Sequence, residues 1–360
     1  MFEPSSLPYN LVLKQATTDA EKQWKEVCLQ FIRDRPDKPW NWNNLSANAS
    51  ITWDMVQEYS DLPWDYDGLS RNPNITWDIV QGNLDKPWSW SNLSSHPAIT
   101  WEIILAHRQY HWDFFRFTSN PNLTWEIIQA NPSLNWDYWQ VSRLSFVTVE
   151  LIQDNFDFYW DWIGISQNAN ITWEIVQAHP TFPWQYFGLS RNPNITWEII
   201  QAHPELPWVW SQVSLNPNVT WEIVQAHPDL PLCYFGLSQN PNMTWDIFMA
   251  FPNMDWERHF ACLTPTLTWQ MIMEDPDNAF YDWEAICYKK MTVGTFPAFE
   301  SLIRARLQDW FLTSDLRDEL MAHVWHPRNI RRFKDLEPDF FGFDVDDETE
   351  EDHLTKKHRI

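Results

Sequence analysis

Carboxylic acids recur along this chain at a fixed interval of 24 residues, or multiples of it. The series consists of Asp54, Asp78, Glu102, Glu126, Glu150, Glu174, Glu198, Glu222 and Asp246. Two carboxylates that share a proton or one metal ion must lie within a few ångströms of each other. Because stacked helices lie ~8–10 Å apart, we expect these acids to complement helix dipoles rather than to form a proton-sharing pair or a cation-binding stripe.

Histidines occupy a second recurring position, at His107, His179, His203 and His227. A zinc site needs ligands that converge on one ion. This spacing instead places one histidine near the end of each helix, where capping of the free carbonyls is favoured. Ser, His and Asp are all present, but no pattern marks a nucleophile with its base. We therefore expect a protein without enzymatic activity, and we expect no cofactor and no metal.

The interval belongs to a tandem repeat, whose most regular feature is a Thr-Trp pair. The pair recurs at Thr52-Trp53, Thr76-Trp77, Thr100-Trp101, Thr124-Trp125, Thr172-Trp173, Thr196-Trp197, Thr220-Trp221, Thr244-Trp245 and Thr268-Trp269. Thr148-Val149 fills the position at which one pair is missing. A fixed period in this range is typical of a stacked array of small structural units.

Residues 192–207, N-P-N-I-T-W-E-I-I-Q-A-H-P-E-L-P, indicate how one repeat folds locally. Thr196 is suited to the N-cap of a first helix. Ile195 and Ile200 then form a hydrophobic staple across this N-terminus. A second helix is expected to begin at Pro207, because proline prefers the first helical position.

Aromatic residues dominate the second helix as well as the first. Tryptophan recurs there at Trp40, Trp64, Trp88, Trp112, Trp136, Trp160, Trp184, Trp208 and Trp256, and a third aromatic position follows two residues later, as at Trp42, Trp90, Trp162 and Trp210. A buried Trp removes ~150–250 Å² from water, so we expect the tryptophans of both helices to be the most buried residues of each repeat. The second helix is expected to end at an asparagine such as Asn216, which tolerates a left-handed backbone conformation.

Glycines share one position just before the leucine of the second helix, at Gly68, Gly164, Gly188 and Gly236. We expect that only a small residue fits there, because a neighbouring helix approaches closely. Binding of a ligand at this position is the weaker interpretation.

These features predict an all-α fold, an α-solenoid of short αα repeats with atypical helical caps. The leucine-rich repeat shares the period, but the prolines and helix caps of this sequence favour two helices. We expect a flexible lead at residues 1–18, an N-terminal cap helix at 19–38, the repeat array at 39–293 with a degenerate copy at 141–165, a C-terminal helical cap at 294–338, and an acidic, disordered tail at 339–360.

The formal net charge of −24 excludes some classes of partner. Nucleic-acid grooves need a basic face, so we expect no nucleic-acid partner. No apolar run is long enough to span a bilayer, and the N-terminus lacks the features of a signal peptide, so we expect a cytosol-like compartment and no membrane. Sequons such as that at Asn194 are expected to serve a turn and a helix cap. The four cysteines lack C-x-x-C spacing and any repeat spacing, so they are expected to be reduced core thiols.

Three motifs resemble a known family. They are N-P-N-I-T-W-E-I-I-Q-A-H-P, P-W-x-[WY]-x-x-L-S-x-N, and M-A-H-V-W-H-P-R-N-I-R-R-F near the end of the chain. Together they are similar to the Trp-rich tandem-repeat proteins encoded by giant DNA viruses of the mimivirus kind, over about residues 29–335. The resemblance implies a viral origin and a location in the host-cell cytoplasm or the virion. It implies no activity for particular residues, and the copy at 141–165 departs from the pattern.

Stacked repeats present long surfaces, so we expect a scaffold that mediates protein–protein interaction. Information about a partner must lie in positions that vary between repeats, and these predict a partner-binding site that includes Asp61, Asp65, Asp67, Arg143, Asp154 and Asp157. The negative charge favours a partner with a basic surface. Two alternatives remain open, a structural component of a virion and a protein that binds glycans or peptides through exposed aromatic residues. The sequence leaves the oligomeric state and the binding face undetermined.

Overall fold

The computed structural model describes residues 7–291, which contain helices and connecting segments but no strand. The chain divides into two compact units, of which Cys28–Thr292 holds the repeats. The array expected at 39–293 ends within one residue of this unit, but the unit starts earlier because it includes the last turns of α1. Helix α1 (Leu7–Arg33) begins before the expected start at residue 19. The cap expected at 294–338 and the tail expected at 339–360 lie outside the described residues.

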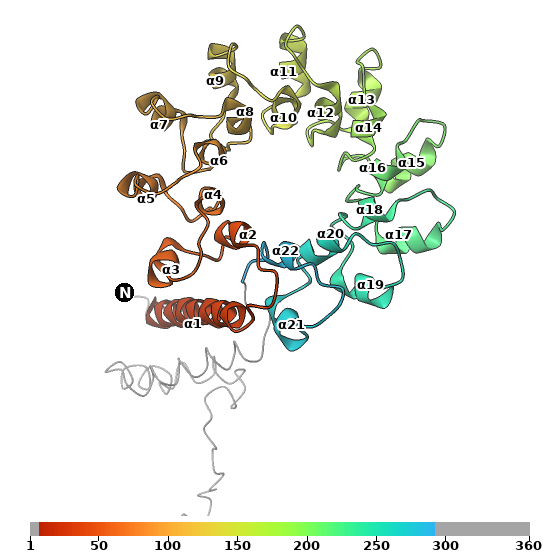
Figure 1. Cartoon of the computed structure of the whole chain (residues 1–360). Helices are drawn as coiled ribbons and strands as arrows, with labels where there is room; N and C mark the ends of the chain where they lie inside the picture. Colours follow the sequence, from red (N-terminus) through yellow and green to blue (C-terminus); the bar gives the residue numbers. More distant parts are fainter. Residues whose placement is uncertain (1–6, 292–360) are drawn as a thin grey trace, which may run out of the picture. The chain divides into compact units, whose positions relative to one another are not determined.

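The first helix of each repeat lies on the outer side of the array in Figure 1. These helices are α3 (Trp53–Glu58), α5 (Trp77–Gly82), α7 (Trp101–Ala106), α9 (Trp125–Ala130), α11 (Val149–Asp154), α13 (Trp173–Ala178), α15 (Trp197–Ala202), α17 (Trp221–Ala226), α19 (Trp245–Ala250) and α21 (Trp269–Glu274). A threonine precedes each one, and at all except α19 its hydroxyl accepts a hydrogen bond from a backbone N–H of the first turn. The predicted N-caps are therefore confirmed, including that of Thr148 in the degenerate copy.

The second helix of each repeat lies on the inner side (Figure 1). These helices are α2 (Trp42–Ser46), α4 (Tyr66–Leu69), α6 (Trp90–Ser94), α8 (Phe114–Phe117), α10 (Tyr138–Arg143), α12 (Trp162–Gln167), α14 (Tyr186–Leu189), α16 (Trp210–Val213), α18 (Tyr234–Leu237), α20 (Arg258–Leu263) and α22 (Trp283–Ile286). The start predicted at Pro207 is wrong, because α16 begins at Trp210 with Val209 as its N-cap. The N–H of Trp208 bonds the carbonyl of Leu206 at 2.8 Å, a turn too tight for a helix.

Buried asparagines join most repeats to the one before, and His96, Leu144 and Thr264 occupy the equivalent position in others. The Nδ2 of Asn192 lies 2.9 Å from the carbonyl oxygen of Ser166, 3.0 Å from that of Asn168 and 3.1 Å from that of Ile171. Its Oδ1 accepts the N–H of Asn194 at 2.8 Å. Asn72, Asn120, Asn216 and Asn240 donate in the same way. The backbone of the equivalent Asn168 is extended, with φ −65° and ψ 133°, so the left-handed conformation expected at this position is not adopted there.

Buried hydroxyl groups make a second link between repeats. The Oγ of Ser190 accepts the N–H of Val209, the N-cap of the next inner helix, at 2.9 Å. Equivalent bonds involve Ser46, Ser70, Ser94, Thr118, Ser142, Ser166, Ser214 and Ser238. Cys262 and Cys287, which are free and buried, take this place near the end of the array, each with Sγ 3.3 Å from a backbone N. These two cysteines therefore do fill a repeat position, contrary to the expectation from their spacing.

Aliphatic residues, not tryptophans, are the most buried residues of a repeat. Ile195 and Leu189 are 0% exposed, whereas Trp197 and Trp208 are each 7% exposed. Several tryptophans of the outer helices are only half-buried, so the prediction that they are the most buried is wrong. The indoles instead bridge neighbouring repeats, as Trp173 and Trp208 do with ring centroids 6.1 Å apart. A large ring at the junction of two short helices leaves one edge in solvent.

The glycine position confirms the expected close approach of neighbouring helices. A Cβ on Gly68 would lie 2.1 Å from the carbonyl oxygen of Asn43 and 2.9 Å from the Cβ of Ser46. A Cβ on Gly236 would lie 2.7 Å from that of Ser214. Real Cβ atoms do not approach so closely, so a side chain here would push successive inner helices apart.

Within Cys28–Thr292 the array closes on itself, and the first repeat packs on the last (Figure 1). The Nδ2 of Asn48 donates to the carbonyl oxygens of Cys287, at 2.9 Å, and Lys289, at 2.7 Å. Trp40 stacks against Trp269 with ring centroids 6.5 Å apart. These contacts repeat those of an ordinary interface. The α-solenoid is thus confirmed, but in this unit the first repeat meets the last repeat instead of a separate cap.

One additional residue precedes α22, and Lys289 then occupies the position of the bridging asparagine. Its Nζ donates to the carbonyl oxygens of Cys262, at 3.2 Å, and Thr264, at 2.6 Å. Burial lowers the pKa of Lys289 to about 8. The last repeat therefore keeps the link between repeats with a different donor.

Candidate functional site

A solvent-accessible hollow lies at the seam where the first repeat meets the last. It has a volume of about 810 Å³ and is lined by Pro39, Trp40, Asn41, Trp42, Asn43, Asp65, Tyr281, Asp282, Trp283 and Glu284. These residues belong to α2, α22 and the segments that precede α2, α4 and α22. Facing residues such as Asn41 and Glu284 are separated by 243 positions, so closure of the array creates the hollow.

Aromatic rings and carboxylates line this seam hollow together. Trp40 lies edge-on to Trp283 with ring centroids 4.9 Å apart. The Nζ of Lys38 lies 5.2 Å from the ring centroid of Trp283 and 2.7 Å from the Oδ1 of Asp277. Glu284 is exposed and adds a further carboxylate. The ammonium group of Lys38 therefore occupies the face of Trp283 in a cation–π contact.

The three predicted acids between residues 61 and 67 make different contacts. Asp65 lines the hollow and is the N-cap of α4, where it accepts a backbone N–H. Asp61 forms an ion pair with Arg33. Asn43 links Asp65 to Asp67, because the Nδ2 of Asn43 lies 2.9 Å from Asp65 Oδ1 and 3.1 Å from Asp67 Oδ2. Asp67 is exposed.

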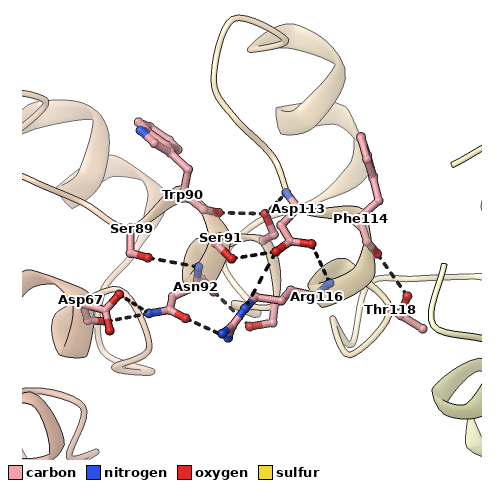
Figure 2. Close-up of polar contacts among 11 residues, drawn as sticks. Asp67, Ser89, Trp90, Ser91, Asn92, Asp113, Phe114, Arg116 and Thr118 are labelled. Atoms are coloured by element: carbon pink, nitrogen blue, oxygen red, sulfur yellow. Dashed lines mark hydrogen bonds and ion pairs between the residues drawn. The ribbon is translucent and has the colours of Figure 1, made fainter. Parts of the chain in front are cut away.

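Polar contacts continue from Asp67 along the inner helices α4, α6 and α8, as Figure 2 shows. Asn92 Nδ2 donates to Asp67 Oδ1 at 2.8 Å, and Arg116 Nη1 donates to Asn92 Oδ1 at 2.9 Å. Ser91 Oγ donates to Asp113 Oδ2 at 2.8 Å. Burial raises the pKa of Asp67, but hydrogen bonds from neighbouring side chains and a nearby arginine charge outweigh it and lower the pKa overall. The carboxylate is therefore ionised and held in place at neutral pH.

The other predicted site residues lie on different elements of the degenerate copy. Arg143 ends the inner helix α10, and its guanidinium carbon lies 4.3 Å from the ring centroid of Trp139. Asp154 ends the outer helix α11, and Asp157 follows it in the connecting segment. Both acids are exposed. No hydrogen bond or ion pair within the described residues joins Arg143 to either acid.

Several residues of the seam hollow are absent from the predicted site. Nothing in the repeat pattern indicates that Tyr281, Trp283 and Glu284 face Asp65, because these residues meet only when the array closes. One signal was available in the sequence. Trp283 occupies the third aromatic position of the last repeat, displaced by the additional residue, just as Trp42 occupies it in the first repeat.

The recurring acids and histidines act separately in each repeat. Hydrogen bonds with the Thr196 hydroxyl and with its own backbone N–H lower the pKa of Glu198. The ring of His203 packs 5.2 Å from that of Trp173, while its backbone carbonyl accepts the indole N–H of Trp208 at 2.8 Å. His203 is the C-cap of α15, as predicted, but its backbone N–H rather than its ring bonds a carbonyl of the helix. In the part of the chain that the structure describes, no group of three His, Cys, Asp or Glu could hold a metal ion.

The third aromatic position bears on the glycan alternative. Its tryptophans, Trp42, Trp90, Trp162 and Trp210, are half-buried. Trp90 stacks on Tyr110 with ring centroids 3.7 Å apart, and Trp42 lies edge-on to Trp64 at 5.6 Å. A sugar would need an open ring face, so this geometry gives the alternative little support.

These observations define a class of protein, a closed array of αα repeats whose interfaces depend on buried asparagine and hydroxyl side chains. Comparison of the chain with family models, with curated proteins and with solved structures gives no match. The resemblance to giant-virus repeat proteins therefore has only its motifs as support. No helix between residues 7 and 291 has both the length and the apolar character needed to cross a membrane.

Proposed function

We propose that this chain is a non-enzymatic scaffold that binds a protein partner, and that it belongs to a large DNA virus and acts in the host-cell cytoplasm or the virion. The observation that supports partner binding is the seam hollow, where aromatic rings and carboxylates lie together. The motif resemblance supports the viral assignment. The separate engagement of the recurring acids in helix caps favours a role without catalysis.

The seam hollow suits an arginine or lysine side chain of the partner. A guanidinium group stacks on indole faces and forms paired hydrogen bonds with carboxylates. Asp65, Asp282 and Glu284 supply the carboxylates, and Trp40 and Trp42, which Lys38 does not cover, supply the aromatic rings. Residues 28–291 contain 12 Lys and Arg against 30 Asp and Glu. The resulting field attracts a basic partner before contact.

Titration with labelled peptides tests the seam hollow. The full chain is mixed with a fluorescein-labelled peptide of alternating Arg and Gly, or with its Glu and Gly counterpart, and fluorescence anisotropy is measured. The Arg peptide is expected to bind saturably and the Glu peptide not to bind. Because exposed charges are screened within ~10 Å at about 0.1 M salt, binding should weaken as salt is raised. Tight binding of both peptides would contradict the proposal.

Two double variants distinguish peptide binding at the seam hollow from binding that depends only on the net charge of the chain. Glu284→Gln with Asp67→Asn removes two charges at or beside the hollow but leaves the helix cap Asp65 in place, and should weaken the Arg peptide about tenfold, or ~1.4 kcal/mol. Asp229→Asn with Asp255→Asn removes two exposed charges in outer connecting segments and should have less than about a twofold effect. Equal losses in both double variants would assign the binding to net charge alone and reject the hollow.

A further inference from the structure

The inner helices α10, α12 and α14 make two successive close contacts, because glycine occupies the same position in two neighbouring repeats. A Cβ on Gly164 would lie 2.6 Å from the carbonyl oxygen of Trp139 and 3.5 Å from the Cγ of Arg143. A Cβ on Gly188 would lie 2.6 Å from the carbonyl oxygen of Ile163. Elsewhere in the array the glycine of this position has larger residues in both neighbouring repeats. Equivalent side chains on these three helices are therefore brought close together.

Two parallel rows of side chains result. Trp139, Ile163 and Phe187 form one row, and Arg143, Gln167 and Arg191 form the other, four residues further along the chain. Arg143 and Gln167 end α10 and α12, whereas Arg191 lies in the turn that follows α14. Residues four apart lie on one face of a helix. Leu189, two residues after Phe187, is 0% exposed, whereas Phe187 is 45% and Trp139 is 39% exposed. Because a helix turns by ~200° over two residues, Phe187 points away from the buried side of α14.

The positive charge of this patch comes from two arginines. Arg143 and Arg191 are the only Lys or Arg residues between Arg116 and Arg258. Neither forms an ion pair within the described residues. Burial, and then the like charge of Arg191, lower the pKa of Arg143, and the opposite charge of Asp137 offsets this only in part. The two guanidinium groups are therefore close enough to repel each other. A carboxylate placed between them would relieve this repulsion.

We propose that the patch made by Trp139, Ile163, Phe187, Arg143 and Arg191 binds an acidic segment of a partner protein that carries bulky apolar side chains beside its carboxylates. The carboxylates pair with the two guanidinium groups, which present several donors in a planar fork. The apolar side chains cover the exposed aromatic rings and remove them from water. This patch takes a segment of opposite charge to the one that suits the seam hollow, so it stands independently of that site.

A labelled peptide in which Asp alternates with Phe and Leu tests the patch on the full chain. Saturable binding in fluorescence anisotropy is expected, together with a loss of at least about tenfold in affinity for Arg143→Gln with Arg191→Gln. Arg191→Gln alone is tested as well, because Arg191 is exposed and its loss leaves the packing intact. Circular dichroism of each variant reports folding. Absence of saturable binding to the unaltered chain at millimolar peptide would overturn the proposal.

Matched controls assign the binding to the patch. Lys86→Gln with Arg108→Gln removes two exposed positive charges in outer segments and should change the affinity less than about twofold. A peptide with Ser in place of Phe and Leu should bind at least about tenfold more weakly, because it lacks the apolar contacts. If both double variants lose affinity equally, the patch is not the site. Binding of the Arg peptide to the seam hollow should be unaffected by Arg191→Gln, so failure of one proposal can be told from failure of the other.

Discussion

At the scale of the residue, a buried asparagine in most repeats supplies hydrogen bonds that the connecting segments cannot make for themselves. Backbone carbonyls in a segment without regular structure must find a donor when they are buried. Asn192 supplies that donor to three carbonyls of the preceding repeat. Leu144 occupies the equivalent position in the degenerate copy and has no such donor. Its backbone, with φ −67° and ψ 149°, is nevertheless close to that of Asn168.

Two substitutions, one that removes this asparagine and one that introduces it, test the link between repeats. Asn192→Leu should destabilise the array by roughly 2–4 kcal/mol, because carbonyls and one N–H lose their partner in a buried place. Leu144→Asn should stabilise it by about 1 kcal/mol, because the backbone already has the required conformation. The measurement is the midpoint of urea unfolding followed by circular dichroism. An unchanged midpoint in Asn192→Leu would show that packing alone sets how one repeat sits on the next.

At the scale of the element, helices of four to six residues are too short to be stable alone in water. Their stability comes from threonine caps, from acids in the first turn and from contacts with the next repeat. The Trp208 indole also bonds the carbonyl at the end of α15, so an aromatic side chain closes one helix while packing against others. Local caps and contacts between repeats therefore support each other.

Two glycines allow the contact between inner helices to be tested. Gly188→Ala should destabilise the array by ~1–3 kcal/mol, because the added Cβ would lie 2.6 Å from the carbonyl oxygen of Ile163 and from the Cβ of Ser166. Gly82→Ala is the matched control, since nothing lies within 4 Å of its added Cβ. That change should be neutral or should stabilise α5 by up to ~1 kcal/mol. Thermal unfolding of the two variants gives the comparison, and equal effects would contradict the close contact.

The acids of the outer helices predict how stability depends on pH. Hydrogen bonds with the threonine hydroxyl and with the backbone N–H lower the pKa of Glu174, Glu198 and Glu222 below the ordinary value of 4.5. A lowered folded-state pKa contributes stability above about pH 4.5 that is lost as the pH falls through the folded value. The urea midpoint should therefore fall between pH 5 and pH 3. The triple change to Gln should flatten this fall, and a fall as steep as that of the unaltered chain would contradict the assignment.

At the scale of the repeat unit Cys28–Thr292, closure lets the first repeat use the same contacts as every other repeat. An open array exposes two unpaired ends, which usually need specialised caps. Here Asn48 bonds carbonyls of the last repeat as Asn192 bonds those of its neighbour. Closure also creates the seam hollow from residues at opposite ends of the array.

Chemical cross-linking tests closure directly. Lys38 Nζ lies 2.7 Å from Asp277 Oδ1, although the two residues are 239 positions apart. A carbodiimide, which joins only groups in contact, should link them by an amide bond that mass spectrometry detects in the monomer. Lys38→Arg keeps the ion pair but cannot form this amide, so the linked peptide should disappear. Absence of the link in the unaltered chain, while other Lys–acid pairs react, would indicate an open array.

The sequence by itself determined the local structure of this protein. The N-cap at Thr196 could be predicted because it depends only on residues a few positions away. The lack of room for a side chain at Gly68 could be predicted because the same contact recurs between repeats. The repeat period likewise predicts a stacked array. It also places Asp65 among the variable positions, though not beside a hollow.

Only the tertiary structure decided that the array closes and what the seam contains. Closure requires the rotations between successive repeats to add up to a full turn, and each rotation depends on how side chains pack between helices rather than on the period. The contacts of Trp40 with Trp269 and Trp283 therefore cannot be predicted from any local sequence pattern. The patch on α10, α12 and α14 has the same origin, because two glycines in succession bring exposed aromatic and arginine side chains together across three repeats.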